Sequence, residues 1–320
     1  MAKILIAEPL ADAGVELLRS AHEVDARPAM TREELLAAVA GVDALVVRSA
    51  TRVDAEVLEA GRDLKGVGRA GIGLDNVAVA AATRLGIMVV HAPQSNVISA
   101  AEHTVALILA QARNIPQAHA ALRNGGWERQ RFRGTELYGK TLGIVGLGRI
   151  GRSVAKKAKG LDMHVIAYDP FLPAEVAESV GVELVDMDTI LEQSDVISIH
   201  MNLTDDNYHM FNKELFAKCK KQPIIINEGR GAMICEEDLA WALDNGLVRA
   251  AGLDMLESEF PELDKCPLLG RDNVIITPHS GFFSDTSMDL LCRLSTINAL
   301  LCYEGRYKEA HIVRNGIGLD

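Results

Sequence analysis

The chain has 320 residues, of which 48% are hydrophobic and 24% charged, so it is long enough for two globular α/β domains that each have a core. Its net charge of −11 and pI near 5.3 argue against nucleic acid as a bulk electrostatic partner. No apolar run approaches the ~20 residues that cross a bilayer, and the first residues are typical of a strand and not of a signal peptide. The five cysteines contain no C-x-x-C pair, which is typical of reduced thiols and not of a metal site. We therefore expect a cytoplasmic protein with reduced thiols and no metal site.

Short apolar runs alternate with helical patterns along the first part of the chain. The patterns predict strands at residues 3–7, 44–48, 64–68 and 87–90, and helices at 11–20 and 31–40. This alternation predicts a parallel sheet with right-handed crossovers. A capping-box pattern at Ser99 and Glu102 then begins a long apolar helix that ends at residues 124–126. We therefore expect one open α/β domain, a connecting helix and a second domain.

Residues 141–169 form a strand–turn–helix–strand pattern typical of dinucleotide binding. Gly146, Gly148 and Gly151 give G-x-G-x-x-G directly after an apolar strand, where glycines allow a tight turn and close approach of backbone amides to a pyrophosphate. The helix that follows directs its positive dipole end at the phosphates. Asp169 ends the next strand, where a carboxylate bonds the adenosine ribose and repels a 2′-phosphate, so we expect NAD and not NADP. The alternative for the three glycines is a plain tight turn, and the alternative for Asp169 is a solvated aspartate at a strand end.

Polar residues end four apolar strands in the second half of the chain. They are His200, Asn227, Asp254 and His279. In open parallel sheets ligands bind at this edge, so these residues indicate a site. Arg230 lies just beyond the second of these strands, and Glu259 lies in the acidic segment after the third. We expect Arg230, Glu259 and His279 to form a reaction set.

Several long strings carry a family resemblance. VRSAT (47–51), GRAGIGLDN (68–76), SNVISAAEHTVAL (95–107) and GTELYGKTLGIVGLGRIG (134–151) resemble the D-isomer-specific 2-hydroxyacid dehydrogenases, and within them the phosphoglycerate dehydrogenase branch. NLTDDNYHMFN (202–212) and TPHSGFFSDTS (277–287) are more similar to the branch of the C-terminal-binding corepressors. Residues 1–152 contain 15 arginines and three lysines, whereas all five cysteines lie in the second half. We therefore expect a chimera of two parents joined near the glycine-rich turn, with uneven drift in one natural gene as the alternative.

The resemblance, which extends over essentially the whole length, implies two doubly wound, Rossmann-like parallel-sheet domains with an active-site cleft between them. Residues 1–94 and 288–320 would form a flavodoxin-like substrate-binding domain, and residues 95–287 the NAD-binding domain. The long helix after Ser99 resembles the family's dimerisation arm. We therefore expect a homodimer through the NAD-binding domain.

The family's catalytic triad falls on Arg230, Glu259 and His279. A histidine can accept and return the hydroxyl proton while hydride moves, a carboxylate on its other nitrogen fixes the tautomer, and an arginine clamps the substrate carboxylate. Phe260 departs from the family's Glu-Pro pair, so Glu257 is the alternative carboxylate. Taken singly, His279 is also typical of a strand-end cap, Glu259 of a solvated loop acid and Arg230 of a surface charge.

The resemblance also implies roles in cofactor and substrate binding. Asp254 would bond the nicotinamide carboxamide, Arg149 and Ile150 would cover the pyrophosphate, and His200 would line the cofactor site. Backbone amides at Ile72 and Gly73 would hold the substrate carboxylate. The remaining predicted substrate-binding residues are Arg48, Ser49, Arg69 and Arg129. The three arginines would serve a substrate phosphate. The alternative is that they are ordinary surface or domain-bridging charges.

The expected reaction is hydride transfer between NAD(H) and a D-2-hydroxy acid or 2-oxo acid, with 3-phosphoglycerate and 3-phosphohydroxypyruvate of serine biosynthesis as the first choice. A small unphosphorylated 2-oxo acid, such as glyoxylate or hydroxypyruvate, is one alternative. An NAD-sensing, corepressor-like binding protein is the other. Nothing in the sequence specifies a protein partner for such a sensor.

Overall fold

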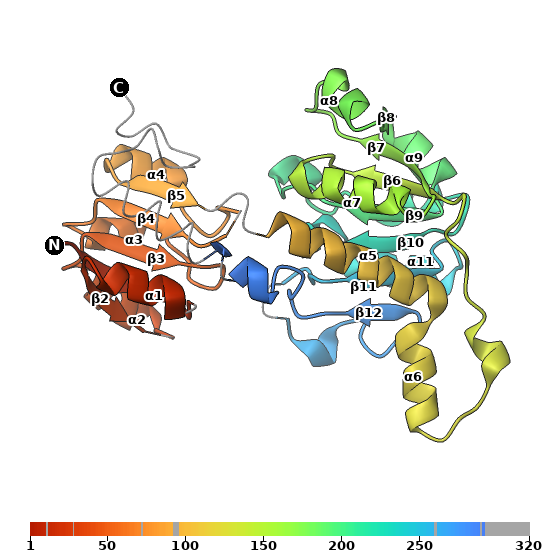
Figure 1. Ribbon diagram of the computed structural model, residues 1–320, viewed down its shortest axis with the longest axis horizontal. Helices are drawn as coiled ribbons and strands as arrows, with labels where there is room; N and C mark the ends of the chain where they lie inside the picture. The colour runs from red at the N-terminus through yellow and green to blue at the C-terminus, as the bar shows by residue number, and fades with distance from the viewer. Residues whose placement is uncertain are drawn as a thin grey trace. The chain divides into compact units, whose positions relative to one another are not determined.

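The computed structural model describes residues 1–10, 12–27, 29–71, 73–91, 96–258, 261–288 and 290–291, and these residues divide into two compact units (Figure 1). Unit 1 comprises Met1–Asn96 and the described residues from Phe283 onward, and unit 2 comprises Val97–Phe282. Each unit contains one parallel sheet, which confirms the predicted α/β fold class. The predicted return of residues 288–320 to the first domain falls mostly outside the described residues and stays a prediction. Among the described helices none has the length and apolarity to span a bilayer.

Unit 1 has a five-stranded sheet in the order β2-β1-β3-β4-β5. Its strands are β1 (Lys3–Ile6), β2 (Glu23–Ala26), β3 (Ala44–Val47), β4 (Gly66–Arg69) and β5 (Met88–His91), and its helices are α1 (Asp12–Arg19), α2 (Arg32–Val39), α3 (Ala55–Ala60) and α4 (Val79–Arg84). The order 2-1-3-4-5 is that of flavodoxin-like folds, whose ligands bind where the order reverses. In unit 1 this point lies between the carboxyl ends of β1 and β3.

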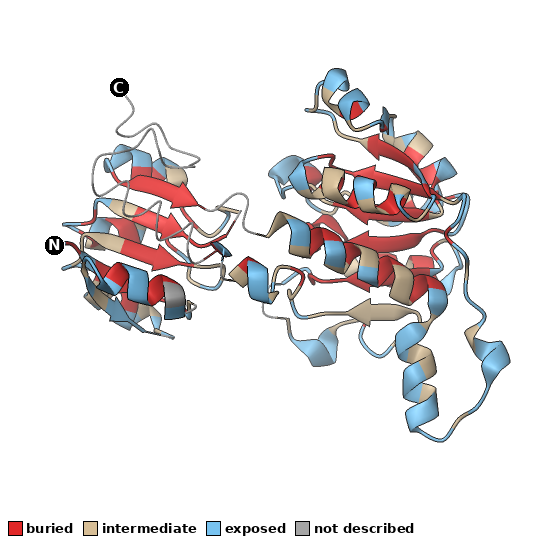
Figure 2. Ribbon diagram, in the orientation of Figure 1, coloured by how far each residue is buried: buried red, intermediate tan, exposed pale blue. Residues whose placement is uncertain are grey.

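The strands of unit 1 other than β2 are largely buried on both faces. Leu5 and Leu45 belong to one apolar cluster, and Ile4, Ile6 and Val46 to another, as the alternation of side chains along a strand requires. Figure 2 shows the central strands of the unit buried. Strand β2 was not predicted, because the run EVDA lies at the sheet edge and is largely exposed, and so lacks an apolar pattern.

Unit 2 has a seven-stranded sheet in the order β12-β11-β10-β9-β6-β7-β8. Its strands are β6 (Thr141–Val145), β7 (His164–Tyr168), β8 (Glu183–Leu184), β9 (Val196–Ile199), β10 (Ile224–Asn227), β11 (Ala250–Leu253) and β12 (Val274–Ile276). The α-helices are α5 (Val97–Arg113), α6 (Ile115–Arg123), α7 (Arg149–Lys159), α8 (Ala174–Ser179), α9 (Met187–Gln193), α10 (Lys213–Ala217) and α11 (Glu236–Asp244). Short 3-10 turns are η1 (Arg129–Phe132), η2 (Asp205–Asn207), η3 (Gly231–Met233) and η4 (Leu263–Lys265). The order reverses between β6 and β9, which marks the expected ligand edge.

The long helix predicted from Ser99 to residue 124 is in fact two helices. Helix α5 begins at Val97, so the predicted capping box at Ser99 is wrong, and the carboxylate of Glu102 instead lies 3.4 Å from Nζ of Lys157. The helix breaks at Asn114, whose φ of 52° is left-handed, and α6 begins at the next residue. The sequence analysis overlooked this break, although Pro116 in the first turn of α6 is a local signal for a new helix start.

Candidate functional site

The glycine-rich turn after β6 has the geometry that its residues require. Gly146 has φ +97°, and a side chain there would come within 2.9 Å of the backbone of His200 and Met201. A methyl group at Gly151 would overlap the carbonyl oxygen of Gly146, so the helix packs directly on the turn. Gly148 is the N-cap of α7, and no described side chain caps this helix. The positive end of the helix dipole lies at this glycine and suits an anionic group.

Asp169 lies beside this turn at the end of β7. Its Oδ2 accepts a hydrogen bond from the backbone N–H of Leu147 at 2.9 Å, and its Oδ1 accepts one from Phe171 at 3.1 Å. Each carboxylate oxygen can accept further bonds, so the half-buried group can also take two hydroxyl donors. Arg149 and Ile150 are the first two residues of α7, the former exposed and the latter half-buried.

His200 follows β9, the strand next to β6. Its Nε2 lies 2.8 Å from Oγ of Ser198, and burial lowers the pKa of the ring to about 3, so the imidazole is neutral. Its Nδ1 is buried, and no described group bonds to it. Because an unsatisfied buried polar atom costs about 1–3 kcal/mol, this nitrogen fits a site that a ligand group completes.

Arg230 is placed by the fully buried Asn227 at the end of β10. The Nδ2 of Asn227 donates to the carbonyl of Arg230 at 3.0 Å, and its Oδ1 accepts from the N–H of Gly229 at 3.0 Å. The guanidinium of Arg230 donates to the carbonyl of Gly229 at 2.9 Å. One buried amide thus holds the turn that carries the arginine.

Asp254 organises the loop that carries His279. Its buried carboxylate accepts hydrogen bonds from Oγ1 of Thr277 at 2.5 Å and from the N–H groups of Ser280 and Gly281 at 2.8 Å each. Its carbonyl accepts from the N–H of His279 at 2.8 Å. His279 has a φ of 50°, a conformation that costs a non-glycine residue roughly 1–3 kcal/mol and persists where its surroundings enforce it.

The imidazole of His279 is half-buried and meets the ring of Phe282 edge-on, with centroids 5.3 Å apart. The predicted partner Glu259 lies outside the described residues. The alternative carboxylate, Glu257, binds a different pair of side chains, since it lies 2.8 Å from Nε2 of His209 and 3.1 Å from the hydroxyl of Tyr208. These contacts give Glu257 a structural role of its own.

In unit 1, the loop after β3 that carries Arg48 and Ser49 is braced by two groups that the sequence analysis missed. The buried carboxylate of Glu8 accepts hydrogen bonds from the N–H groups of Arg48 and Thr51 at 2.8 Å each. The amide of Asn76 donates to the carbonyls of the same two residues at 2.7 Å each. The side-chain chemistry of these groups is common in loops, so only their spatial position identifies them.

The other predicted substrate residues are spread over both units. Arg69 is buried at the end of β4, and a methyl group at Gly71 would overlap its guanidinium. Gly73 is half-buried, and Ile72 lies outside the described residues. Arg129 is exposed and belongs to η1 in unit 2, whereas Arg48 and Arg69 belong to unit 1.

Two further residues of unit 2 lie at the same strand edge and were not predicted. Oε1 of Glu228, the residue after β10, lies 2.5 Å from Nδ1 of His103 on α5. A carboxylate directly after a buried strand was a signal in the sequence. The histidine gave none, because it lies within an apolar helix 125 residues away.

Comparison with known proteins gives consistent matches. Residues 105–281 match the model of the D-isomer specific 2-hydroxyacid dehydrogenase family, NAD binding domain. The D-3-phosphoglycerate dehydrogenase of Methanocaldococcus jannaschii is 50% identical over 282 residues, which are 88% of this chain and 53% of that protein. The chain thus spans about half the length of the curated relatives it matches.

Solved structures match over nearly the full length. A Thermus thermophilus protein superposes with a TM-score of 0.90 at 31% identity, covering 97% of this chain and 100% of that one. A glyoxylate reductase from Paecilomyes thermophila gives a TM-score of 0.87 at 28% identity, covering 98% of this chain and 97% of that one.

Proposed function

Because the chain belongs to the D-isomer-specific 2-hydroxyacid dehydrogenase family, we propose that it transfers hydride between NAD and a D-2-hydroxy acid or its 2-oxo form. The observation that carries the proposal is the single ligand edge of unit 2. The glycine-rich turn, Asp169, Arg230, Asp254 and His279 all follow the carboxyl ends of strands in one parallel sheet. Reactions of open α/β sheets take place at this edge.

The residues of this edge fit a dinucleotide. The uncapped start of α7 and the turn at Gly146 would take the pyrophosphate, Asp169 would take the ribose hydroxyls, and Asp254 and His200 would face the nicotinamide end. When bound, NAD supplies the hydride acceptor. The orphaned Nδ1 of His200 and the space above Gly148, where a side chain would meet nothing within 4 Å, both support this fit.

The protein's part in the reaction is to bind, orient and move one proton. His279 takes the hydroxyl proton of the alcohol as it is oxidised and returns a proton to the carbonyl in the reverse direction. Arg230 clamps the substrate carboxylate and polarises the carbonyl. Glu259 would orient the imidazole and stabilise its charged form.

For the substrate we propose 3-phosphoglycerate, oxidised to 3-phosphohydroxypyruvate, a step that would place the protein in serine biosynthesis. The 50% identity to a D-3-phosphoglycerate dehydrogenase and the braced loop at Arg48 support this choice. A small unphosphorylated 2-oxo acid is the second candidate, favoured by the similarity to a glyoxylate reductase. The cytoplasmic location expected from the sequence stays a prediction.

We also propose a homodimer formed through residues 114–135, here called the arm. Helix α6 of the arm extends away from the sheet of unit 2 in Figure 1 and has no buried residue. Ile115, Leu122 and Trp127 are 55%, 53% and 78% exposed, an apolar surface that a second copy would cover.

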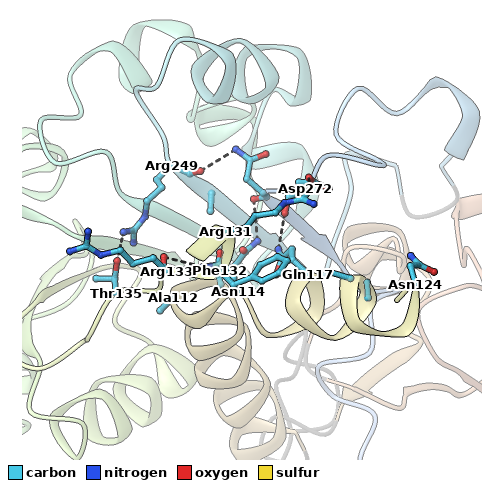
Figure 3. A pocket seen from close by; sticks show the side chains of 15 residues that line it. Ala112, Asn114, Gln117, Asn124, Arg131, Phe132, Arg133, Thr135, Arg249 and Asp272 are labelled. Atoms are coloured by element: carbon cyan, nitrogen blue, oxygen red, sulfur yellow. Dashed lines mark hydrogen bonds and ion pairs between the residues drawn. The ribbon is translucent and has the colours of Figure 1, made fainter. Parts of the chain in front are cut away.

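The base of the arm is tied to the body of unit 2. Arg131 lies 2.8 Å from the carboxylate of Asp272, and Arg249 donates to Oγ1 of Thr135 at 2.6 Å (Figure 3). A fixed base presents the exposed apolar residues in a defined place. Light scattering on the wild type and on Leu122→Asp should give a dimer and a monomer respectively, and a monomeric wild type would exclude the proposal.

The activity is tested by NADH oxidation with a panel of 2-oxo acids that includes 3-phosphohydroxypyruvate, hydroxypyruvate and glyoxylate. Turnover of the phosphorylated acid with the highest kcat/KM supports the first substrate. Preference for glyoxylate or hydroxypyruvate supports the second. Tight NADH binding without turnover of any acid would overturn the enzymatic proposal in favour of an NAD-sensing binding protein.

A further inference from the structure

A buried histidine–carboxylate pair lies at the ligand edge of unit 2, outside the predicted reaction set. The side chain of Glu228 is 2% exposed and that of His103 is 23% exposed, and the distance from Nδ1 of His103 to Oε1 of Glu228 is 2.5 Å. Glu228 follows β10 and His103 lies on α5, so the pair joins the sheet to the helix that covers it. Burying a carboxylate is costly unless a partner offsets the lost hydration.

The other oxygen of Glu228 lies against the loop that carries His279. A methyl group at Gly281 would overlap Oε2 of Glu228 and come within 3.0 Å of Oδ2 of Asp254. One atom each of His103, Glu228 and Asp254 lie within 4.8 Å of one another. Two carboxyl groups therefore converge under Gly281, whose N–H donates to Asp254.

We infer that the His103–Glu228 pair is a positioning element that seats residues 277–281 on Asp254 by keeping one proton between its two side chains. With that proton in place the pair is neutral overall, and Asp254 is the one net charge among the three groups. Without it, a second carboxylate faces Asp254, and repulsion opposes the hydrogen bonds that Ser280 and Gly281 donate. The inference rests on the proposed function for the role of His279, but not for the geometry of the loop.

The charges around the pair agree with this assignment. Burial raises the pKa of Glu228 to about 7, and the neighbouring Asp254 raises it further while His103 and His279 lower it. The bond to Glu228 raises the pKa of His103. Both pKa values are raised in the folded protein. The stability that the protonated pair gives to the seated loop is therefore complete at low pH and is lost as the pH rises through about 7.

The same three side chains have the types that ligate a cation. Asp254, however, already accepts hydrogen bonds on both oxygens from donors of the loop, and Glu228 is bonded to His103. A cation would have to displace these donors. The arrangement therefore favours a shared proton over a metal ion.

The test follows amide hydrogen exchange of Ser280 and Gly281 in the intact 320-residue chain from pH 6 to 9, expressed as protection factors. Protection in the wild type should fall by up to about tenfold per pH unit as the pH rises toward and through about 7, the limit for one linked proton, and should level off once the proton is lost. Glu228→Gln should keep its protection at every pH, because the amide carries no charge and can both accept from His103 and donate to Asp254. Glu228→Ala should lose protection at every pH.

Glu102→Gln is the matched control, because Glu102 precedes His103 on the same helix and its side chain is 65% exposed. It should follow the wild type. An unchanged pH dependence in Glu228→Gln, or full protection in Glu228→Ala with its circular dichroism intact, would overturn the inference.

A second readout is the pH profile of kcat/KM, in which the alkaline decline of Glu228→Gln should be shallower than the decline that the wild type and Glu102→Gln share. The two proposals fail separately. Exchange that follows the expected pattern without turnover of any 2-oxo acid removes the enzymatic function alone. Turnover with exchange that does not respond to pH or to Glu228→Gln removes the positioning role alone.

Discussion

Replacing Asp169 by asparagine should shift the preference between NAD and NADP. The asparagine keeps one oxygen to accept from Leu147, so the glycine-rich turn is retained while the charge is lost. Hydrogen bonds to a charged group contribute about 1.5–3 kcal/mol and neutral ones about 0.5–1.5 kcal/mol, so two ribose hydroxyls lose about 2–3 kcal/mol together. The variant also removes the repulsion of a 2′-phosphate. The ratio of kcat/KM for NAD to that for NADP should therefore fall by about 30- to 140-fold, at 1.4 kcal/mol per tenfold.

The measurement is steady-state kinetics with both cofactors and one 2-oxo acid. Asp188→Asn serves as the control, since Asp188 is 66% exposed and pairs with Lys218 on the surface. Equal losses with NAD and NADP in Asp169→Asn would show that the carboxylate holds the turn and does not contact the ribose. Such a result would refute the assignment of Asp169, but it would leave the glycine-rich turn as the pyrophosphate site.

Three further substitutions test the reaction set and the substrate. His279→Ala should lower kcat by about 10² to 10⁴ with NADH binding, followed by fluorescence, nearly unchanged. Glu259→Gln should lower kcat less than His279→Ala, because the imidazole loses the carboxylate that orients it but keeps its own nitrogen for the proton; such a loss in Glu257→Gln in place of Glu259→Gln would reverse our choice between them. Arg48→Gln should raise KM for 3-phosphohydroxypyruvate far more than for glyoxylate, and equal increases for both would show that Arg48 does not serve a phosphate.

The features predicted well from the sequence are those whose physical cause is local. The positive φ at Gly146 and the close packing at Gly151 depend on a few neighbouring residues, so the motif and the strand before it predict them directly. Strand-end residues such as Asp254 and His279 were predicted because parallel strands align their carboxyl ends. The sheet of unit 2 confirms that these two residues follow adjacent strands.

What the sequence could not predict depends on contacts between distant segments. Glu8 and Asn76 brace the loop at Arg48, and His103 meets Glu228, across separations that no local pattern records. The break at Asn114 was missed for another reason, since Pro116 marks it locally but the apolar periodicity that continues through it was followed instead. Whether the chain joins two parents stays a prediction.

Gly281 provides a last test of how the loop is seated. A methyl group there would overlap Oε2 of Glu228, so Gly281→Ala should displace the loop and lower kcat at least tenfold. Gly41→Ala is the control, because a side chain at Gly41 would meet nothing within 4 Å. If Glu228 is the group that the methyl meets, Glu228→Ala removes the obstacle, and the double variant should be no less active than Glu228→Ala alone. Residues in contact give such non-additive effects, whereas distant ones add. Additive losses in the double variant would mean that Gly281 and Glu228 do not meet in solution, and the seating of His279 would then depend on Asp254 without Glu228.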